Sequence, residues 1–215
     1  MTILITGANR GIGKALFEAY HKTDEEVLGT ARSATASLLP LDVNDPASVT
    51  ALAKTLSGRT IDLLICNAGV YLDKGQTLAS GYPPQMWTDS FATNVTGVFL
   101  CIQALLPNLR QSNSPKIAII SSQMASDERA PGGSLIYRAS KAAALNLGRN
   151  LAVDLAPEGI AVGIYHPGWV QTDMGGASAS ITPDEAAEGL VKRFSALSPA
   201  TTGCFETWDG RGHPF

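Results

Sequence analysis

The sequence predicts a single α/β domain built on a doubly wound, parallel sheet of about seven strands. Short apolar runs alternate with helix-like segments along the 215 residues, and several runs are apolar on successive residues rather than on alternate ones. Continuous apolar runs are typical of strands buried on both faces, as in a parallel sheet covered by helices. Strands that alternate with helices favour the doubly wound arrangement.

The expected elements follow one another in order. Thr182 is the expected N-cap of the last helix, because Pro183 follows at the first helical position and Glu185 completes a capping box. The expected strands cover residues 2–6, 26–31, 37–41, 62–66, 116–121, 160–166 and 203–208. The other expected helices cover residues 12–22, 46–57, 84–111 and 137–156.

The connection between the second and third expected strands is unusually short. Residues 32–36 alone separate the two runs, which is too few for a crossover helix. Either the second strand–helix unit has lost its helix, or the third strand pairs through a bare loop. We favour a helix that is shortened or missing.

The composition indicates a globular protein without a strongly charged binding surface. A chain that is 45% apolar and 16% charged can bury a sizeable core, and a net charge of -3 favours neither nucleic acid nor membrane as a partner. Cys66, Cys101 and Cys204 lack metal-site spacing, so we expect buried, reduced thiols and no metal. No apolar run reaches the roughly 18 residues of a membrane span, and the N-terminus shows no signal peptide. We therefore expect a cytoplasmic protein.

A glycine-rich loop, TGANRGIG (6–13), joins the first strand to the first helix. Glycine adopts positive φ and lets the backbone approach a pyrophosphate closely. A helix N-terminus adds free N–H groups and the positive end of the helix dipole. The alternative is a tight turn that binds nothing, but the strand–loop–helix context favours a dinucleotide site.

Further motifs follow in order: CNAG (66–69), FATNVTG with Asn94, IISS (119–122), YRASK (137–141) and HPGWVQTDM (166–174). Together with the glycine loop they resemble the short-chain dehydrogenase/reductase family, in its sniffer/C-factor-like branch of small carbonyl reductases. The resemblance implies a Rossmann-type fold, a nicotinamide cofactor, a small-molecule carbonyl or alcohol substrate, and a possible homodimer or homotetramer.

The resemblance also implies which residues bind the cofactor. Asp42 would border the adenine, and the Val170 backbone and Thr172 would contact the nicotinamide end. The full implied set is Gly7, Asn9, Arg10, Gly11, Ile12, Gly13, Arg32, Asp42, Val43, Asn67, Ala68, Gly69, Tyr137, Lys141, Pro167, Gly168, Val170 and Thr172.

The charges near the second strand favour NADP(H) over NAD(H). An acid about 20 residues after the glycine loop would hold the 2′-hydroxyl of NAD. Arg32 stands there instead, and Arg10 lies inside the glycine loop. Guanidinium groups bind a 2′-phosphate through charge-assisted hydrogen bonds. The alternative is that both arginines are solvated surface charges.

Tyr137 and Lys141 lie four residues apart, so on a helix they share one face. Tyrosine has a pKa near 10 and is a poor acid–base group at neutral pH. A nearby ammonium would favour the phenolate, so we expect Lys141 to lower the pKa of Tyr137. The alternative for an isolated YxxxK is an ordinary amphipathic helix.

Two further residues complete the expected catalytic group. Ser122, at the end of the fifth strand, would donate a second hydrogen bond to the carbonyl oxygen, with Ser121 as the lesser candidate. Asn94 would hold a water that relays protons to Lys141, unless its side chain back-bonds within its helix. Ser122 precedes Tyr137 by 15 residues where the resemblance gives about 13, so the connecting loop is expected to be enlarged.

Residues 166–180 are expected to form a flexible lid, or else a plain surface loop. Trp169, Met174 and the loop 71–87 would give an apolar, aromatic pocket, and His166 is expected as a strand-end residue rather than a base. The favoured function is NADPH-dependent reduction of a ketone or aldehyde with Tyr137 as general acid. A cofactor-binding signalling or redox-sensing protein with little turnover is the alternative, and a dehydrogenase would use the same site.

Overall fold

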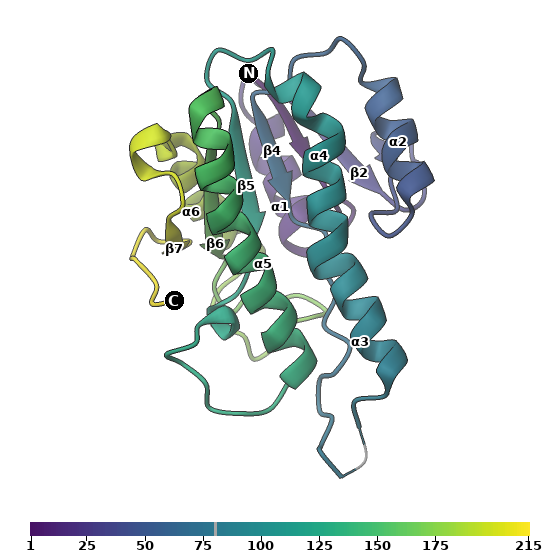
Figure 1. The fold of residues 1–215 in the computed structure, drawn as a ribbon, viewed down its shortest axis with the longest axis vertical. Helices are drawn as coiled ribbons and strands as arrows, with labels where there is room; N and C mark the ends of the chain where they lie inside the picture. The colour runs from purple at the N-terminus through teal and green to yellow at the C-terminus, as the bar shows by residue number, and fades with distance from the viewer. Residues whose placement is uncertain (80) are drawn as a thin grey trace.

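The chain forms one seven-stranded parallel sheet between two layers of helices (Figure 1). The computed structural model describes residues 1–79 and 81–215. The strand order β3-β2-β1-β4-β5-β6-β7 confirms the predicted doubly wound fold, and every neighbouring pair is parallel. The strands are β1 (Thr2–Ile5), β2 (Glu26–Ala31), β3 (Leu38–Pro40), β4 (Leu63–Cys66), β5 (Lys116–Ile120), β6 (Ala161–His166) and β7 (Phe205–Thr207).

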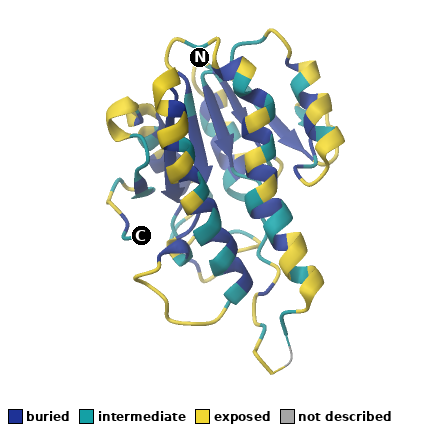
Figure 2. Ribbon diagram, in the orientation of Figure 1, coloured by how far each residue is buried: buried dark blue, intermediate teal, exposed yellow. Residues whose placement is uncertain are grey.

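The helices divide between the two faces because successive strand residues point to opposite sides of the sheet. Ile3 and Ile5 pack with α1 and α6, whereas Leu4 packs with α2, α4 and α5. Figure 2 shows the strands buried between helices whose outer sides are exposed. The helices are α1 (Gly11–His21), α2 (Pro46–Thr55), α3 (Pro84–Phe91), α4 (Gly97–Leu109), α5 (Leu135–Leu155) and α6 (Pro183–Ala196), with the short helical turns η1 (Ala92–Thr96), η2 (Gln123–Ala125), η3 (Ala156–Glu158) and η4 (Pro199–Thr201).

The second and third strands are joined without a helix, as we predicted. The connection still returns the chain to a parallel neighbour, because β3 is short and its first residue, Leu38, pairs with Gly29. Gly29 lies two residues before the end of β2, so the chain has to retreat by only about 7 Å. The second strand–helix unit has therefore lost its helix, and a bare loop takes the place of that helix between β2 and β3.

One long helix combines α3, η1 and α4. By length and composition alone, Pro84–Leu109 could cross a membrane, although its sequence contains no continuous apolar run of that length. In this fold its α4 part packs on the sheet through Val98, Ile102 and Leu105. It therefore covers the core, which accounts for its apolar composition.

The predicted capping box of α6 is present. The Thr182 hydroxyl accepts from the Glu185 N–H, and the Glu185 carboxylate accepts from the Thr182 N–H. Cys66 and Cys101 are buried as predicted, whereas Cys204 is only partly buried. Burial raises the pKa of Cys101 to about 12, so its thiol stays protonated and unreactive at neutral pH.

Candidate active site

A cavity of about 430 Å³ opens at the carboxyl ends of the strands, around the point between β1 and β4 where the strand order reverses. In open α/β sheets ligands bind at this switch point. Of the predicted cofactor-binding residues, Gly168 and Val170 are not among the lining residues of the described chain. The rest line the cavity: Gly7, Asn9, Arg10, Gly11, Ile12, Gly13, Arg32, Asp42, Val43, Asn67, Ala68, Gly69, Tyr137, Lys141, Pro167 and Thr172.

The three glycines of the first loop serve different needs. Gly7 and Gly11 adopt φ of 70° and 54°, a region that favours glycine. Gly13 is required by packing, because a Cβ there would lie 2.1 Å from the Gly7 carbonyl oxygen and 2.4 Å from Asn67 Nδ2. The loop can thus fold back against the end of β4.

The N-terminus of α1 is open toward the cavity. Its N-cap residue, Arg10, makes no side-chain cap hydrogen bond, and the first turn carries no acidic residue. Gly11, Ile12 and Gly13 of this first turn line the cavity. Free N–H groups and the positive helix end form an anion site, so these residues fit a pyrophosphate.

Asn67 ties the two sides of the switch point together. Its Nδ2 donates to the carbonyl oxygens of Thr6 and Gly7, both at 3.0 Å. The Thr6 hydroxyl in turn accepts from the Asn67 and Ala68 N–H groups at 3.0 Å. The NAG motif therefore holds the glycine loop in place, a structural contribution that the sequence analysis missed.

Both predicted arginines lie at the cavity. Arg32 is exposed and lines it directly. Arg10 forms an exposed ion pair with Asp173 across the cavity, at 3.3 Å. A 2′-phosphate would compete with the Asp173 carboxylate for the Arg10 guanidinium. The two cations fit the 2′-phosphate of NADP(H). Asp173 was not among the cofactor-site residues predicted from the sequence.

Tyr137 stands in the first turn of α5 and is only 8% exposed. Its ring stacks on Tyr71, with ring centroids 4.3 Å apart. The Ser122 side chain hydrogen-bonds Tyr137, while Ser121 donates to the Lys141 carbonyl oxygen at 3.0 Å. The structure therefore brings Ser122, and not Ser121, against Tyr137.

The expectation that Lys141 lowers the pKa of Tyr137 was wrong for this structure. Burial raises that pKa to about 12, and the hydrogen bond from Ser122 opposes the rise only in part. Burial also lowers the pKa of Lys141 to about 8, so Lys141 is still an ammonium at neutral pH, but its charge does not offset the effect of burial on Tyr137. Tyr137 is thus a protonated phenol at neutral pH: it carries a proton that it can donate, and it is a weaker acid than an exposed tyrosine.

Lys141 is buried in front of the carboxyl end of β5. Its Nζ donates to the Ile120 carbonyl oxygen at 2.9 Å and lies 5.7 Å from the centroid of the Tyr137 ring. A Cβ built on Gly69 would lie 3.4 Å from this Nζ and 3.2 Å from Asn94 Oδ1. The Lys141 ammonium and the Asn94 side chain therefore both lie next to the backbone of Gly69.

Asn94 lies in η1, a π-helical turn, and turns of this kind often occur at functional sites. Its side chain does not back-bond within the helix. Oδ1 accepts from the Val70 N–H, and Nδ2 donates to the Val70 carbonyl oxygen and to Ser140 Oγ, all at 2.9 Å. Oδ1 has a second lone pair that could accept from a water, and the proton relay through Asn94 stays a prediction.

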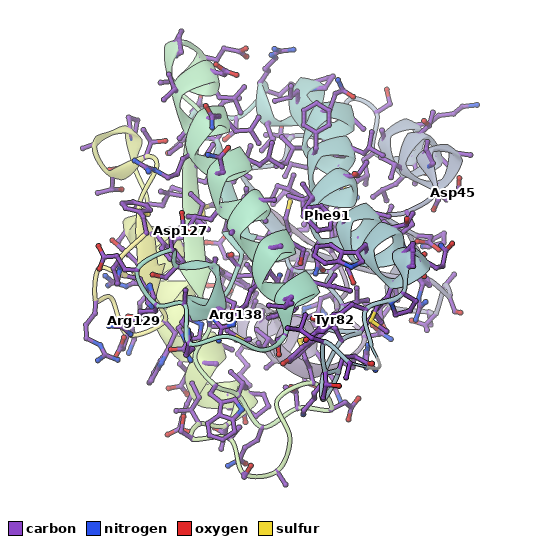
Figure 3. The ribbon with its side chains drawn as sticks, turned by 60° about the horizontal axis from the view of Figure 1, so that its bottom comes forward. Asp45, Tyr82, Phe91, Asp127, Arg129 and Arg138 are labelled. Atoms are coloured by element: carbon purple, nitrogen blue, oxygen red, sulfur yellow. The ribbon has the colours of Figure 1, made fainter. Side chains whose placement is uncertain are left out.

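The enlarged loop before α5 is pinned by Arg138. Its Nε donates to the Gly133 carbonyl oxygen and its Nη1 to that of Arg129 (Figure 3). Gly132, Gly133 and Ser134 all have positive φ. These positive φ angles turn the chain just before α5, and Ser122 lies beside Tyr137; that the loop is longer than in relatives stays a prediction.

The segment after β6 crosses the cavity. Trp169 is 51% exposed, and its Nε1 donates to the Gly175 carbonyl oxygen at 2.9 Å. Met174 lines the cavity, and Lys74 Nζ donates to the Met174 carbonyl oxygen at 3.1 Å. This contact joins the segment to the loop after β4; residue 80, in the predicted pocket loop 71–87, lies outside the described residues.

His166 ends β6, as expected. It is buried beside His213, with ring centroids 5.9 Å apart, and burial lowers its pKa to about 4. It is therefore neutral at pH 7. Within residues 1–79 and 81–215 no group of three His, Cys, Asp or Glu side chains could hold a metal ion.

Two residues at the site were missed from the sequence: Tyr71, which stacks on Tyr137, and Asp73, which binds its backbone N–H. They lie more than 60 residues before Tyr137 in a loop without a regular pattern. The available signal was an aspartate that directly follows the run VYL (70–72), close after the NAG motif.

The fold and the cavity at its switch point define a doubly wound α/β protein of the dinucleotide-binding type. The family model described as short chain dehydrogenase matches residues 1–181. The chain therefore belongs to the short-chain dehydrogenase/reductase family, which confirms the resemblance inferred from its motifs.

Known relatives support the predicted branch. The C-signal protein of Myxococcus xanthus is 36% identical over 169 residues, which cover 77% of this chain and 99% of that protein. The NADPH-bound carbonyl reductase from chicken fatty liver superposes with a TM-score of 0.90 at 30% identity, covering 100% of this chain and 98% of that one. The carbonyl reductase Sniffer of D. melanogaster gives 0.92 at 27% identity, covering 100% and 99%.

Proposed function

We propose that this oxidoreductase uses NADPH to reduce a ketone or aldehyde to the alcohol, with Tyr137 as the proton donor. The observation that carries the proposal is the state of Tyr137: a buried, protonated phenol at the cavity wall, hydrogen-bonded by Ser122. A phenol held in this form can protonate a carbonyl oxygen as that oxygen gains negative charge.

The cofactor assignment rests on the chain's own groups. The open N-terminus of α1 would hold the pyrophosphate, and Arg10 and Arg32 would hold a 2′-phosphate. The solved relative from chicken fatty liver, which contains NADPH, supports the same choice. When bound, the cofactor would supply the hydride that reaches the carbonyl carbon.

The residues around Tyr137 then have separate tasks. Ser122 would donate to the carbonyl oxygen and hold it near the phenol. Tyr137 would give up its proton to this oxygen, and Lys141 and Asn94 would return a proton to Tyr137 from solvent. The exposed Trp169 and the cavity-lining Met174 would contact an apolar part of the substrate.

The test is NADPH consumption over a panel of ketones and aldehydes. Wild type should consume NADPH with at least one carbonyl, and Tyr137→Phe should still bind NADPH but lose about 100-fold or more in kcat. Tyr20→Phe is the matched control, because it removes a buried phenol from α1 on the other face of the sheet. A Tyr137→Phe protein with wild-type kcat would contradict the proposed role.

The signalling alternative is kept because of the C-signal relative. It predicts a wild type that binds NADPH tightly and consumes none with any carbonyl. The same panel therefore distinguishes the two functions.

A further inference from the structure

Asp73 is a fully buried carboxylate beside the first turn of α5. Its Oδ2 accepts from the Ile136 N–H at 2.8 Å and from the Tyr137 N–H at 3.3 Å, and its Oδ1 accepts from the Tyr137 N–H at 3.2 Å. A carboxylate from a distant loop thus caps the helix at the residue that carries the phenol.

The local sequence cannot supply this cap. An N-cap residue is normally extended, and its side-chain oxygen accepts from the helix N–H groups. Ser134, at the N-cap of α5, is left-handed with φ of 50° and makes no cap hydrogen bond. Its hydroxyl pairs with the Tyr71 hydroxyl instead. Without Asp73, the buried N–H groups of Ile136 and Tyr137 would lose the acceptors that the structure gives them.

The segment that carries Asp73 also holds the Tyr137 side chain. Tyr71, two residues earlier, stacks on the Tyr137 ring. Val70, at the start of the segment, is anchored at both its N–H and its carbonyl by Asn94. Residues 70–73 therefore connect Asn94 to the backbone and the ring of Tyr137.

We propose that Asp73 is a positioning residue for Tyr137: its carboxylate fixes the first turn of α5, so that the phenol is held against Ser122. This inference rests on the proposed function, in which Tyr137 donates the proton. Asp73 contacts neither substrate nor cofactor in this scheme and acts through the backbone of Tyr137.

The charge of Asp73 gives the proposal a second consequence. The groups that act on the Tyr137 phenol are Tyr71 and Asp73 from the loop after β4, Ser122 after β5 and Lys141 from α5. The negative charge of Asp73 disfavours the phenolate and so contributes to the raised pKa of Tyr137, after the larger effect of burial. Removing the charge while keeping the oxygen should favour the phenolate and lower this pKa.

Asp73→Ala and Asp73→Asn separate the two effects. Asp73→Ala should lower kcat by at least about tenfold at unchanged NADPH affinity, since a misplacement on the order of 1 Å costs up to about a hundredfold. Its amides at residues 136 and 137 should exchange with solvent faster than those of wild type. Asp73→Asn keeps an acceptor oxygen, so it should restore most of kcat while the titration midpoint of the Tyr137 phenol moves to lower pH.

Asp45→Ala is the matched control. Asp45 caps α2 by accepting from the Ala47 N–H at 2.9 Å, so its loss should reduce stability without changing kcat or the pH profile. Wild-type kcat in Asp73→Ala, or an unmoved midpoint of the Tyr137 phenol in Asp73→Asn, would overturn the proposal.

Failure of the proposed function can be told apart from failure of this inference. If wild type consumes no NADPH, the proposed function fails. The role of Asp73 can then be tested through the pKa of the Tyr137 phenol. The absorbance difference between proteins with Tyr137 and with Tyr137→Phe reports the phenol titration without turnover. A midpoint that is lower in Asp73→Asn than in the Asp73 protein supports the inference, and an equal midpoint overturns it.

Discussion

Replacing Lys141 by methionine should stabilise the protein while it abolishes turnover. Lys141 is 5% exposed, and burial lowers its pKa from 10.5 to about 8. At about 1.36 kcal/mol per pKa unit, holding the ammonium in this site costs about 3 kcal/mol at pH 7. Methionine fills a similar volume and carries no charge. The variant forfeits the hydrogen bond to the Ile120 carbonyl, so we expect a net gain of about 2 kcal/mol.

The gain should depend on pH with a definite sign. Below pH 8 the lysine is protonated in both the folded and the unfolded chain, so wild type carries the whole penalty. Between pH 8 and 10.5 the unfolded chain binds a proton that the folded chain has lost, so the stability of wild type rises relative to the variant. The advantage of Lys141→Met should therefore be full near pH 7, fall to zero by about pH 10, and give way to a small disadvantage at pH 10.5, where only the lost hydrogen bond remains.

Chemical denaturation of both proteins from pH 7 to 10.5 measures this difference in the free energy of unfolding. Buried tyrosines and cysteines titrate in the same pH range, but both proteins contain them, so their contributions cancel in the comparison. Lys54→Met, at an exposed position of α2, is the control and should change the free energy of unfolding by less than about 0.5 kcal/mol. A variant that is no more stable than wild type at pH 7, or an advantage that is constant with pH, would refute the reasoning.

Three further predictions concern the cofactor site and the core. Arg32→Asp should weaken NADPH binding much more than NADH binding, because it places a carboxylate where a 2′-phosphate is expected; equal losses in titrations with the two cofactors would contradict the assignment. Gly13→Ala should destabilise the fold by about 3 kcal/mol, because the new Cβ would meet the Gly7 carbonyl at 2.1 Å. Thermal unfolding measures this, with Gly212→Ala as the control, since no atom lies within 4 Å of a Cβ there. Asn108→Ala should cost about 2 kcal/mol or more, because the buried Nδ2 donates to the carbonyl oxygen of Leu56, at the C-cap of α2, at 2.6 Å and to that of Arg59, in the turn beyond it, at 2.7 Å. Denaturant unfolding tests it, and the exposed Asn150→Ala should leave the midpoint unchanged.

The sequence predicted the fold because its signals are local. Each strand buried on both faces is a continuous apolar run. The N-terminus of α6 is specified by its N-cap Thr182, by Pro183 at the first helical position and by Glu185 in the capping box. The predicted helix and strand ranges agree with the observed ones to within a few residues. The missing helix between β2 and β3 was visible as a simple lack of residues.

The sequence predicted most of the residues that form the candidate site, but not the direction in which their pKa values shift. Most of the residues predicted from the glycine loop and the other motifs line one cavity, but the described lining does not include Asn94, Ser122, Gly168 and Val170. Spacing does not reveal burial, however, and burial determines that the pKa of Tyr137 rises instead of falling. The contact between Asp73 and Tyr137 depends on the path of an irregular loop, and nothing in the local sequence of either residue specifies it.

The strand order has a consequence for how the protein folds. The two walls of the cavity meet only when β1 pairs with β4, where Ile3 lies beside Leu63, whereas β2 and β3 are joined by a connection of six residues. Pairings between distant segments form slowly, because a long stretch of chain must be ordered first. We therefore expect the β2–β3 pair to form early and the β1–β4 pair late. Cofactor affinity should then appear together with cooperative folding of the whole sheet, and neither half of the chain should acquire it alone.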